Sequence, residues 1–279
     1  MPSGRAPVRE TPPLMTNRFV RMLDLTTGPP GADGADHFVA TPPGEGFLFG
    51  GFTMALGLQA AARTTDAAFV PKSLHTLFLR PGAWGPKLDL LVTRVNDSRS
   101  FAIRRVALTQ ADRTVAEVTA TFHLPEPGED RQHAELPDAP APDTLDPTNP
   151  LLPVPEIMEI RPVTPFDRLV GETAHPYWAR FPDLPADDSL VQSCAVTFVS
   201  DYMVIFTPFP KGSEGGSEYL SRTLSHSLWF HRPPVGEWLL LSSTPLTIGD
   251  GRFTSQGTVH DRQGGLVASF VQEGILRPQ

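Results

Sequence analysis

The fold is decided by the stretch Ser73-Leu-His-Thr-Leu-Phe-Leu-Arg-Pro-Gly82, which recurs in altered form as Ser225-His-Ser-Leu-Trp-Phe-His-Arg-Pro233. The shared Arg-Pro pair lies at positions 80 and 232, an offset of 152 residues. A constant offset across several turns indicates a duplication, because insertions gather in loops while strand registers stay fixed. The same offset relates three further pairs: Phe101 and Phe253, Val115-Ala116 and Val267-Ala268, and Leu124 and Leu276.

Each half is predicted to hold one helix followed by a run of antiparallel strands. The stretch from Phe49 to Arg63 is rich in helix formers and apolar on nearly every side, which predicts a buried helix. In the second half we expect a short helix from Asp201 and then a loop from Gly212 to Ser217. Segments rich in Leu, Val, Ile, Phe and Thr predict strands at 73–80, 87–96, 100–110 and 113–123, and again at 223–232, 237–243, 252–261 and 265–276.

A proline-rich segment separates the two halves. Eleven prolines lie between Leu124 and Pro165, a density that neither a helix nor a central strand tolerates. We therefore expect an N-terminal unit at 1–123, a linker at 124–165 and a C-terminal unit at 166–279. A buried helix against a curved antiparallel sheet is the hotdog arrangement. Two tandem copies predict an α+β double hotdog whose sheets join edge to edge and so cover exposed strand edges.

Composition excludes several classes of function. The net charge of −8, with 23 scattered basic residues, argues against nucleic acid as a partner. The single cysteine, Cys194, excludes an internal disulfide and a cysteine-based metal cage, and its apolar surroundings predict a buried structural thiol. The N-terminus has no apolar signal core, and no apolar run approaches about 20 residues. We therefore expect a cytoplasmic protein without a membrane partner.

Standard catalytic motifs are missing from the sequence. It has no Gly-x-Ser-x-Gly nucleophile motif, no phosphate-binding Gly-x-x-x-x-Gly-Lys-Ser/Thr loop, and no histidine pair at metal-ligand spacing beside a carboxylate. His226 and His231 lie five apart on a predicted strand and so face opposite sides. We expect no metal site and no cofactor.

Four ordered phrases carry a resemblance to a known family. Two are the repeated stretches quoted above, and the others are Ser98-Arg-Ser-Phe-Ala-Ile-Arg-Arg-Val106 and Val267-Ala-Ser-Phe-Val-Gln-Glu-Gly274. Together they resemble bacterial acyl-CoA thioesterase II, a double-hotdog family, from about Phe47 to Arg277. The resemblance implies hydrolysis of acyl-CoA, or of an acyl-carrier-protein thioester, to free acid and thiol without metal or redox cofactor, in bacterial lipid metabolism.

The resemblance also implies a catalytic set. In that family an Asp, a Thr or Ser and a Gln hold the attacking water, and matching phrase by phrase puts these roles on Asp201, Thr223 and Gln272. A carboxylate can accept the water's proton while a hydroxyl and an amide orient its lone pair. From the repeat, Gln272 corresponds to Ala120, so it places a polar amide in a strand core, where it needs partners.

Substrate-binding residues are predicted on general physical grounds. Gly50 and Gly51 at a helix start could offer backbone N–H groups to the oxyanion of the tetrahedral intermediate. Arg104 and Arg105 could contact the phosphates of coenzyme A, since an acidic protein must concentrate positive charge locally to bind that anion. A solvated strand face would explain the two arginines almost as well.

Plainer interpretations stay open for each candidate. Asp201, after Ser200, could be an ordinary N-cap, and Thr223 an ordinary strand threonine. His75 and His226 are more often structural histidines than general bases, so neither is counted as catalytic.

Two departures from the family pattern leave other functions open. Family members typically have Gln where this chain has Phe52, and Asp where it has Ser225. The alternatives are a hotdog dehydratase or hydratase, for which His226 with Asp201 is the candidate pair, or a catalytically silent acyl-binding protein. Family habit and broad sheet edges predict a homo-oligomer.

Overall fold

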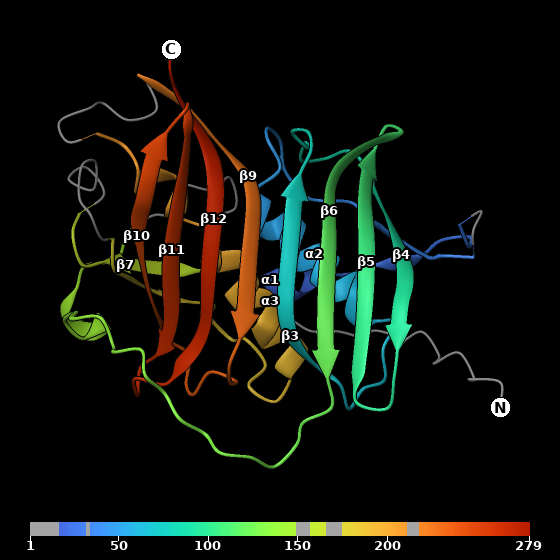
Figure 1. Ribbon diagram of the computed structural model, residues 1–279, viewed down its shortest axis with the longest axis horizontal. Coiled ribbons are helices and arrows are strands. Elements are labelled where there is room, and N and C mark those ends of the chain that lie inside the picture. Colours follow the sequence, from blue (N-terminus) through green and yellow to red (C-terminus); the bar gives the residue numbers. More distant parts are fainter. Residues whose placement is uncertain (1–16, 32–33, 149–156, 166–174, 211–217) are drawn as a thin grey trace.

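One antiparallel sheet forms the framework of the molecule. The computed structural model describes residues 17–31, 34–148, 157–165, 175–210 and 218–279. In these ranges the strands join in the order β1-β2-β4-β5-β6-β3-β9-β12-β11-β10-β8-β7 (Figure 1). Their bounds are β1 Thr26–Thr27, β2 Asp36–Ala40, β3 Val70–Phe78, β4 Leu88–Asp97, β5 Phe101–Gln110, β6 Arg113–His123, β7 Glu159–Pro162, β8 Tyr177–Arg180, β9 Tyr219–Phe230, β10 Leu239–Gly249, β11 Arg252–Asp261 and β12 Leu266–Pro278.

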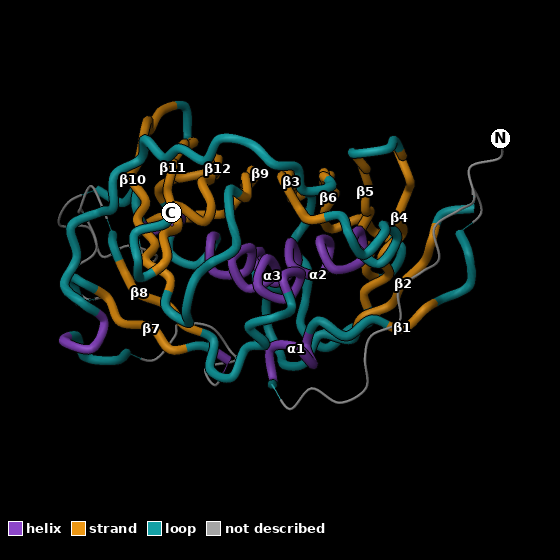
Figure 2. The backbone as a smooth tube through the Cα atoms, turned by 90° about the horizontal axis from the view of Figure 1, so that it is seen from below, coloured by secondary structure: helices purple, strands orange, loops and turns teal. Residues whose placement is uncertain are grey.

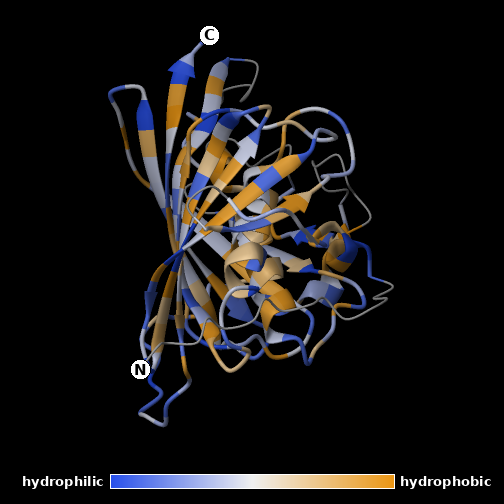
Figure 3. Cartoon of the chain, turned by 90° about the vertical axis from the view of Figure 1, so that its right-hand side faces the viewer, coloured by the Kyte–Doolittle hydropathy of each residue, from blue (hydrophilic) through white to orange (hydrophobic). Residues whose placement is uncertain are grey.

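The helices lie together on one side of this sheet. They are α1 Arg18–Met22, α2 Gly50–Ala62 and α3 Ser189–Ser200, with short 3₁₀ turns at Pro142–Thr144 and Val204–Phe206. The sheet curves so that its outer strands, β1 and β2 at one end and β7 and β8 at the other, wrap toward the helices (Figure 2). The central helices are predominantly apolar (Figure 3), and α2 is buried from Gly51 to Ala62. This is the double hotdog that the sequence predicts.

The two halves meet where β3 pairs with β9 at the centre of the sheet. His75 there faces Ser227, its own counterpart 152 residues later, and the His75 Nδ1 and Ser227 Oγ atoms lie 3.0 Å apart. The offset recurs in the neighbouring pairs, because Leu74 faces Ala120 in one half and His226 faces Gln272 in the other. The duplication predicted from sequence is therefore confirmed as a structural repeat.

The core depends on the close antiparallel contact between α2 and α3. Small residues on one face of α2 let the helices approach, since a Cβ atom on Gly51 would collide with the backbone carbonyl oxygen of Phe198. One turn further along, the Cys194 Sγ atom lies 3.7 Å from the Ala55 carbonyl oxygen. Cys194 is fully buried, as predicted. The start of α2 thus faces the end of α3.

The sequence prediction for the second helix is wrong. We expected a helix starting at Asp201, whereas α3 ends at Ser200 and Asp201 is its C-cap residue. The second half holds 18 residues between α3 and β9, against seven between α2 and β3, so the offset that fits the strands does not fit the helices. The predicted loop from Gly212 to Ser217 lies outside the described residues.

The described part of the proline-rich segment leaves the lower end of β6 and passes below the strand ends toward β7 in the view of Figure 1. Its last part is strand β7, Glu159–Pro162, which pairs with β8. This pairing makes the end of the expected linker part of the C-terminal sheet. Pro162 is tolerated in β7 because this is an edge strand, whose outer side carries only an isolated bridge between Ile160 and Thr148 among the described residues.

One described segment, Ser189–Phe206, is long and apolar enough for a membrane span, yet 67% of it is buried inside the molecule. Buried core helices meet the same criteria, and this segment is α3 with the turn that follows it.

The Gly51 contact predicts a clear stability effect. Gly51→Ala should lower the free energy of unfolding by about 1–3 kcal/mol, because the added methyl group overpacks the contact between α2 and α3. Thermal denaturation measures the change. Gly128→Ala is the matched control, since a Cβ atom there meets nothing within 4 Å. Equal melting temperatures for the two variants would contradict the predicted tight contact.

Candidate active site

Asp201 lies where the two central helices meet. It follows the last residue of α3 and is 5% exposed. The start of α2 faces it: a Cβ atom at Gly50 would lie 2.5 Å from Asp201 Oδ2, and the backbone N–H of Gly51 donates a hydrogen bond to the carboxylate. Glycine at both positions is required for this close approach. The N-cap interpretation is wrong, because the N-cap residue of α3 is Asp188.

Two opposing effects set the proton affinity of Asp201. Burial raises its pKa to about 7, while hydrogen bonds from the Gly51 amide and the Thr223 hydroxyl act in the opposite direction. Desolvation disfavours the charged carboxylate, and donors that bind the charge favour it. Because burial is the larger effect, the carboxyl group is poised to gain or lose a proton near neutral pH.

A β-bulge in β9 brings the side chain of Thr223 to the same side of the sheet as that of His226. In the pairing of β9 with β12, Ser225 faces Glu273 and Thr223 faces Gly274, so Leu224 is the extra residue. A regular strand would point side chains 223 and 226 to opposite faces, whereas the inserted residue lets both point inward. The Thr223 Oγ1 atom then lies 3.5 Å from Asp201 Oδ1, a long hydrogen bond.

Gln272 completes a hydrogen-bonded chain that leads away from Asp201. Its amide Nε2 donates to Thr223 Oγ1 at 3.1 Å, and its Oε1 lies 2.8 Å from His226 Nδ1. The His226 Nε2 atom lies 3.1 Å from Ser200 Oγ. Gln272 and His226 are both fully buried. The three residues of the predicted catalytic set are thus brought together, with Gln272 behind Thr223.

A cavity of about 490 Å³ opens between the two halves at this point. Asp201 and Thr223 line it, whereas Gln272 does not. Its walls come from the start of α2, the end of β3 and the start of β9, and they are mostly apolar, including Phe49, Phe78 and Phe206. This volume is typical of small-molecule sites.

Comparison with protein families identifies the chain's relatives. The model for the acyl-CoA thioesterase N-terminal domain matches residues 40–123, and the model for the acyl-CoA thioesterase C-terminal domain matches residues 130–276. The chain belongs to the acyl-CoA thioesterase family. Each family domain corresponds to one of the two structural repeats, so the resemblance seen in the sequence is confirmed.

Individual relatives agree with this assignment. Acyl-CoA thioesterase 2 of Haemophilus influenzae is 27% identical, with 82% of this chain and 87% of the relative covered. Human acyl-coenzyme A thioesterase 8 is 26% identical over 82% and 80% of the two chains. The crystal structure of an acyl-CoA thioesterase II from Mycobacterium marinum superposes with a TM-score of 0.76 at 27% identity, over 94% of this chain and 97% of the other.

A weaker likeness concerns the fold alone. The dehydratase domain from a curacin polyketide synthase superposes with a TM-score of 0.51 at 11% identity, over 90% of this chain and 95% of that one.

The sequence prediction for Gly51 needs correction within this thioesterase site. Its backbone N–H is bound to the Asp201 carboxylate and is therefore not free for an oxyanion. Gly50 lines the cavity at the first turn of α2, where backbone N–H groups have no partner within the helix. Its role as an oxyanion donor stays a prediction.

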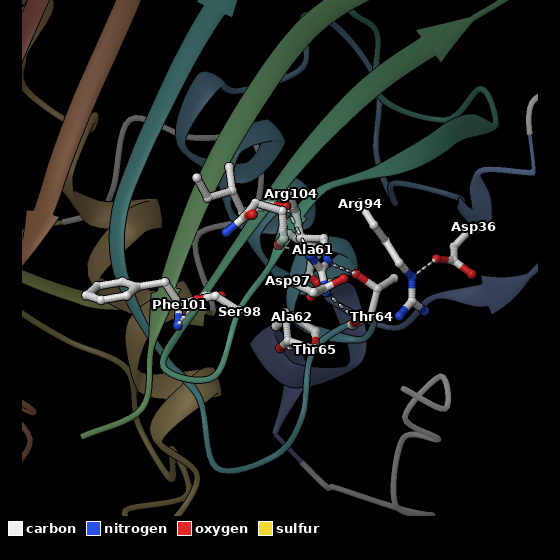
Figure 4. A network of polar contacts seen from close by, with 12 residues as sticks. Asp36, Ala61, Ala62, Thr64, Thr65, Arg94, Asp97, Ser98, Phe101 and Arg104 are labelled. Atoms are coloured by element: carbon white, nitrogen blue, oxygen red, sulfur yellow. Dashed lines mark hydrogen bonds and ion pairs between the residues drawn. The ribbon is translucent and has the colours of Figure 1, made fainter. Parts of the chain in front are cut away.

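The predicted contact of Arg104 with the phosphates of coenzyme A is wrong, because the guanidinium is buried and its N–H groups are hydrogen-bonded within the protein. The side chain is 1% exposed, donates to the Oγ1 and carbonyl oxygens of Thr64, and pairs with Asp97 at 2.6 Å (Figure 4). Arg105, the next residue on β5, is exposed on the opposite face of the sheet. Neither residue lines the cavity, and the proposed contact of Arg105 with coenzyme A stays a prediction.

The cations that do line the cavity were missed in the sequence. Arg80 and Arg222 lie at its rim, and the Arg222 guanidinium sits 5.5 Å above the ring of the exposed Phe47. Arg80 was visible in the first quoted stretch, but only the folded chain brings it near Arg222. Among the described residues, no group of three or more His, Cys, Asp and Glu side chains is arranged to hold a metal ion.

The two departures from the family pattern do not reach the cavity. Phe52 is fully buried and stacks on Trp84, with ring centroids 4.9 Å apart. Ser225 pairs with Leu77 and Glu273 within the sheet. Neither residue is part of the cavity lining. The change at position 52 is therefore accounted for by core packing.

The pKa of Asp201 predicts the pH dependence of the activity. If ionised Asp201 is the base, kcat/KM should be constant well above pH 7 and fall about tenfold per pH unit well below it, because protonation removes the base. Initial rates of thiol release at subsaturating substrate, between pH 5 and pH 9, measure this dependence. A rate that stays level down to pH 5 would exclude Asp201 as the base.

Proposed function

We propose that this chain hydrolyses acyl-CoA thioesters to a free carboxylic acid and coenzyme A, with Asp201 as general base. The observation that carries the proposal is the buried carboxylate, with a pKa raised to about 7, at the wall of an apolar cavity between the two halves. A general base works best when its pKa lies near the working pH. The names of the relatives point to the same substrate class.

The reaction follows from the position of these groups. Ionised Asp201 accepts a proton from a water molecule as the water oxygen bonds to the thioester carbonyl carbon. The C–S bond then breaks, and the proton on Asp201 returns to the departing thiolate. Thr223 borders the cavity beside Asp201 and orients the water. Gln272, which does not line the cavity, fixes the Thr223 hydroxyl by donating a hydrogen bond to it. The Gly50 amide at the start of α2 is the proposed donor to the oxyanion.

The cavity lining suggests where the acyl chain and the coenzyme A part of the substrate bind. Its apolar wall suits an acyl chain, whose burial is favourable by about 0.8 kcal/mol per CH₂ group. Among the described residues, the charged side chains of its lining besides Asp201 are Arg80 and Arg222. Guanidinium groups bind phosphate in a bidentate manner, and coenzyme A carries phosphates. We therefore assign the thiol end of the substrate to the rim formed by Arg80 and Arg222.

A panel of acyl-CoA esters of increasing chain length tests the reaction. Release of free thiol is the measurement, and Asp201→Asn should lower kcat by about 10²- to 10⁴-fold because the base is lost. Asp250→Asn is the matched control, since the Asp250 side chain is 94% exposed. No thiol release at any chain length would contradict the proposed function. Undiminished release by Asp201→Asn would contradict the mechanism alone.

The arginine assignment has its own test. Arg222→Gln and Arg80→Gln should raise KM for acyl-CoA but leave KM nearly unchanged for the same acyl group on N-acetylcysteamine, a thiol without phosphates. Arg105→Gln is the comparison. If Arg105→Gln changes the ratio of the two KM values and the rim variants do not, the thiol end lies at Arg105 instead.

The alternative reactions receive less support. His226 Nδ1 lies 3.9 Å from Asp201 Oδ1, so the candidate dehydratase pair is close together. A dehydratase needs a histidine that faces the substrate, however, whereas His226 is fully buried and does not line the cavity. The likeness to a dehydratase domain concerns the fold alone. The silent acyl-binding function relied on Phe52 and Ser225, and neither lines the cavity.

Several expectations from sequence stay predictions. They are the unit limits at 1–123, 124–165 and 166–279, the cytoplasmic location, the homo-oligomer, and the absence of nucleic-acid, membrane and cofactor partners. The sheet-edge argument for association is weakened, because the edge strands β1 and β7 have two and four residues. Exposed Leu77, Phe101 and Trp229 remain as a reason to expect association.

A further inference from the structure

His226 is a buried titratable residue that the proposed reaction does not use directly. It lies on β9 directly opposite Gln272, and its ring stacks on Phe270 with centroids 5.3 Å apart. The side chain is fully buried, and it does not line the cavity. A histidine in such a position needs a partner for each ring nitrogen.

The contacts of His226 fix which ring nitrogen carries the proton. The Gln272 Oε1 atom, 2.8 Å from Nδ1, is a carbonyl oxygen that can only accept, so Nδ1 must donate. Burial lowers the pKa of His226 to about 4, which keeps the ring neutral at pH 7. The Nε2 atom then carries no proton. It lies 3.1 Å from Ser200 Oγ, whose own proton is donated to the Thr197 carbonyl oxygen at 2.9 Å.

This arrangement gives the hydrogen bonds one direction. His226 donates to Gln272, Gln272 to Thr223, and Thr223 to Asp201. A reversed Gln272 amide would turn its oxygen toward Thr223. The Thr223 proton would then go to that oxygen, and the Asp201 carboxylate would lose a donor.

We propose that His226 is a positioning residue that holds the Gln272 amide with its N–H groups toward Thr223, so that the Thr223 proton stays directed at Asp201. This role rests on the proposed hydrolysis. It acts through Gln272, and His226 itself touches neither substrate nor water.

Kinetics of two substitutions test the role. His226→Leu removes the donor and should lower kcat for acyl-CoA about 10- to 100-fold with KM changed by less than about twofold, as expected for lost orientation of a catalytic group. His226→Asn offers an amide N–H near the position of Nδ1 and should recover most of the loss. His231→Leu is the matched control. This histidine also contacts a serine hydroxyl, that of Ser269 at 2.9 Å, but it is not part of the hydrogen-bonded series that leads to Asp201.

A double-mutant cycle separates positioning from general damage. In a Gln272→Met background, His226→Leu should cause no further loss of kcat, because the residue it positions is gone. Fully additive losses would show that His226 does not act through Gln272. Thiol release by the unsubstituted protein is measured first, so failure of the proposed hydrolysis is recognised separately.

Nitrogen NMR of the unsubstituted protein gives a test that needs no folded variant. The ¹⁵N shifts of the His226 ring, assigned by their absence from His226→Asn or His226→Leu, or by selective labelling if neither folds, should report a neutral ring protonated at Nδ1. A ring protonated at Nε2 would mean that the Gln272 amide is reversed, and it would overturn the proposal.

Discussion

The structure depends on a close contact between the start of α2 and the end of α3. Gly50 and Gly51 allow it, because a side chain at either position would strike Asp201 or the Phe198 carbonyl. The contact buries a carboxylate beside the Gly51 backbone N–H and the Thr223 hydroxyl, and the loss of hydration outweighs these two donors. A packing constraint between two helices thereby determines the acid–base property on which the proposed chemistry relies.

The two halves use this geometry differently. Gln272 pairs with Ser255 across the sheet, whereas its counterpart Ala120 pairs with Arg104. The Arg104 guanidinium reaches Thr64, just beyond the end of α2, where a cation is favoured by the helix dipole (Figure 4). Where the second half has a carboxylate after its helix, the first half has a buried, hydrogen-bonded arginine after its own. The second half holds the proposed base, and the first half contributes cavity walls, Gly50 and Arg80.

Much of the fold was predictable because it follows from local patterns. The eight long strands and helix α2 are marked by alternation, turn residues and composition, and the 152-residue offset survives in their registers. Helix α3 was missed because the offset does not hold across connections of different length. The run from Cys194 to Val199 is apolar without a clear period, and such runs do not distinguish a buried helix from a strand.

The site was predictable in its residue types and less so in its geometry. Asp201, Thr223 and Gln272 came from family phrases, but the bulge at Leu224 and the position of Gln272 behind Thr223 require the strand register. Adjacent strand residues face opposite sides, so Arg104 and Arg105 could not both contact one ligand from a regular strand. The 152-residue offset relates Leu74 to His226 and Ala120 to Gln272. Once Leu74 is known to face Ala120, the offset puts His226 opposite Gln272.

The contact between His75 and Ser227 has an evolutionary consequence. In a dimer of identical chains the corresponding position would meet its own copy, and every mutation in the gene would alter both sites at once. Within one chain the two positions are encoded separately, and they already differ as histidine and serine. In a fused chain, one half can therefore change without changing the other.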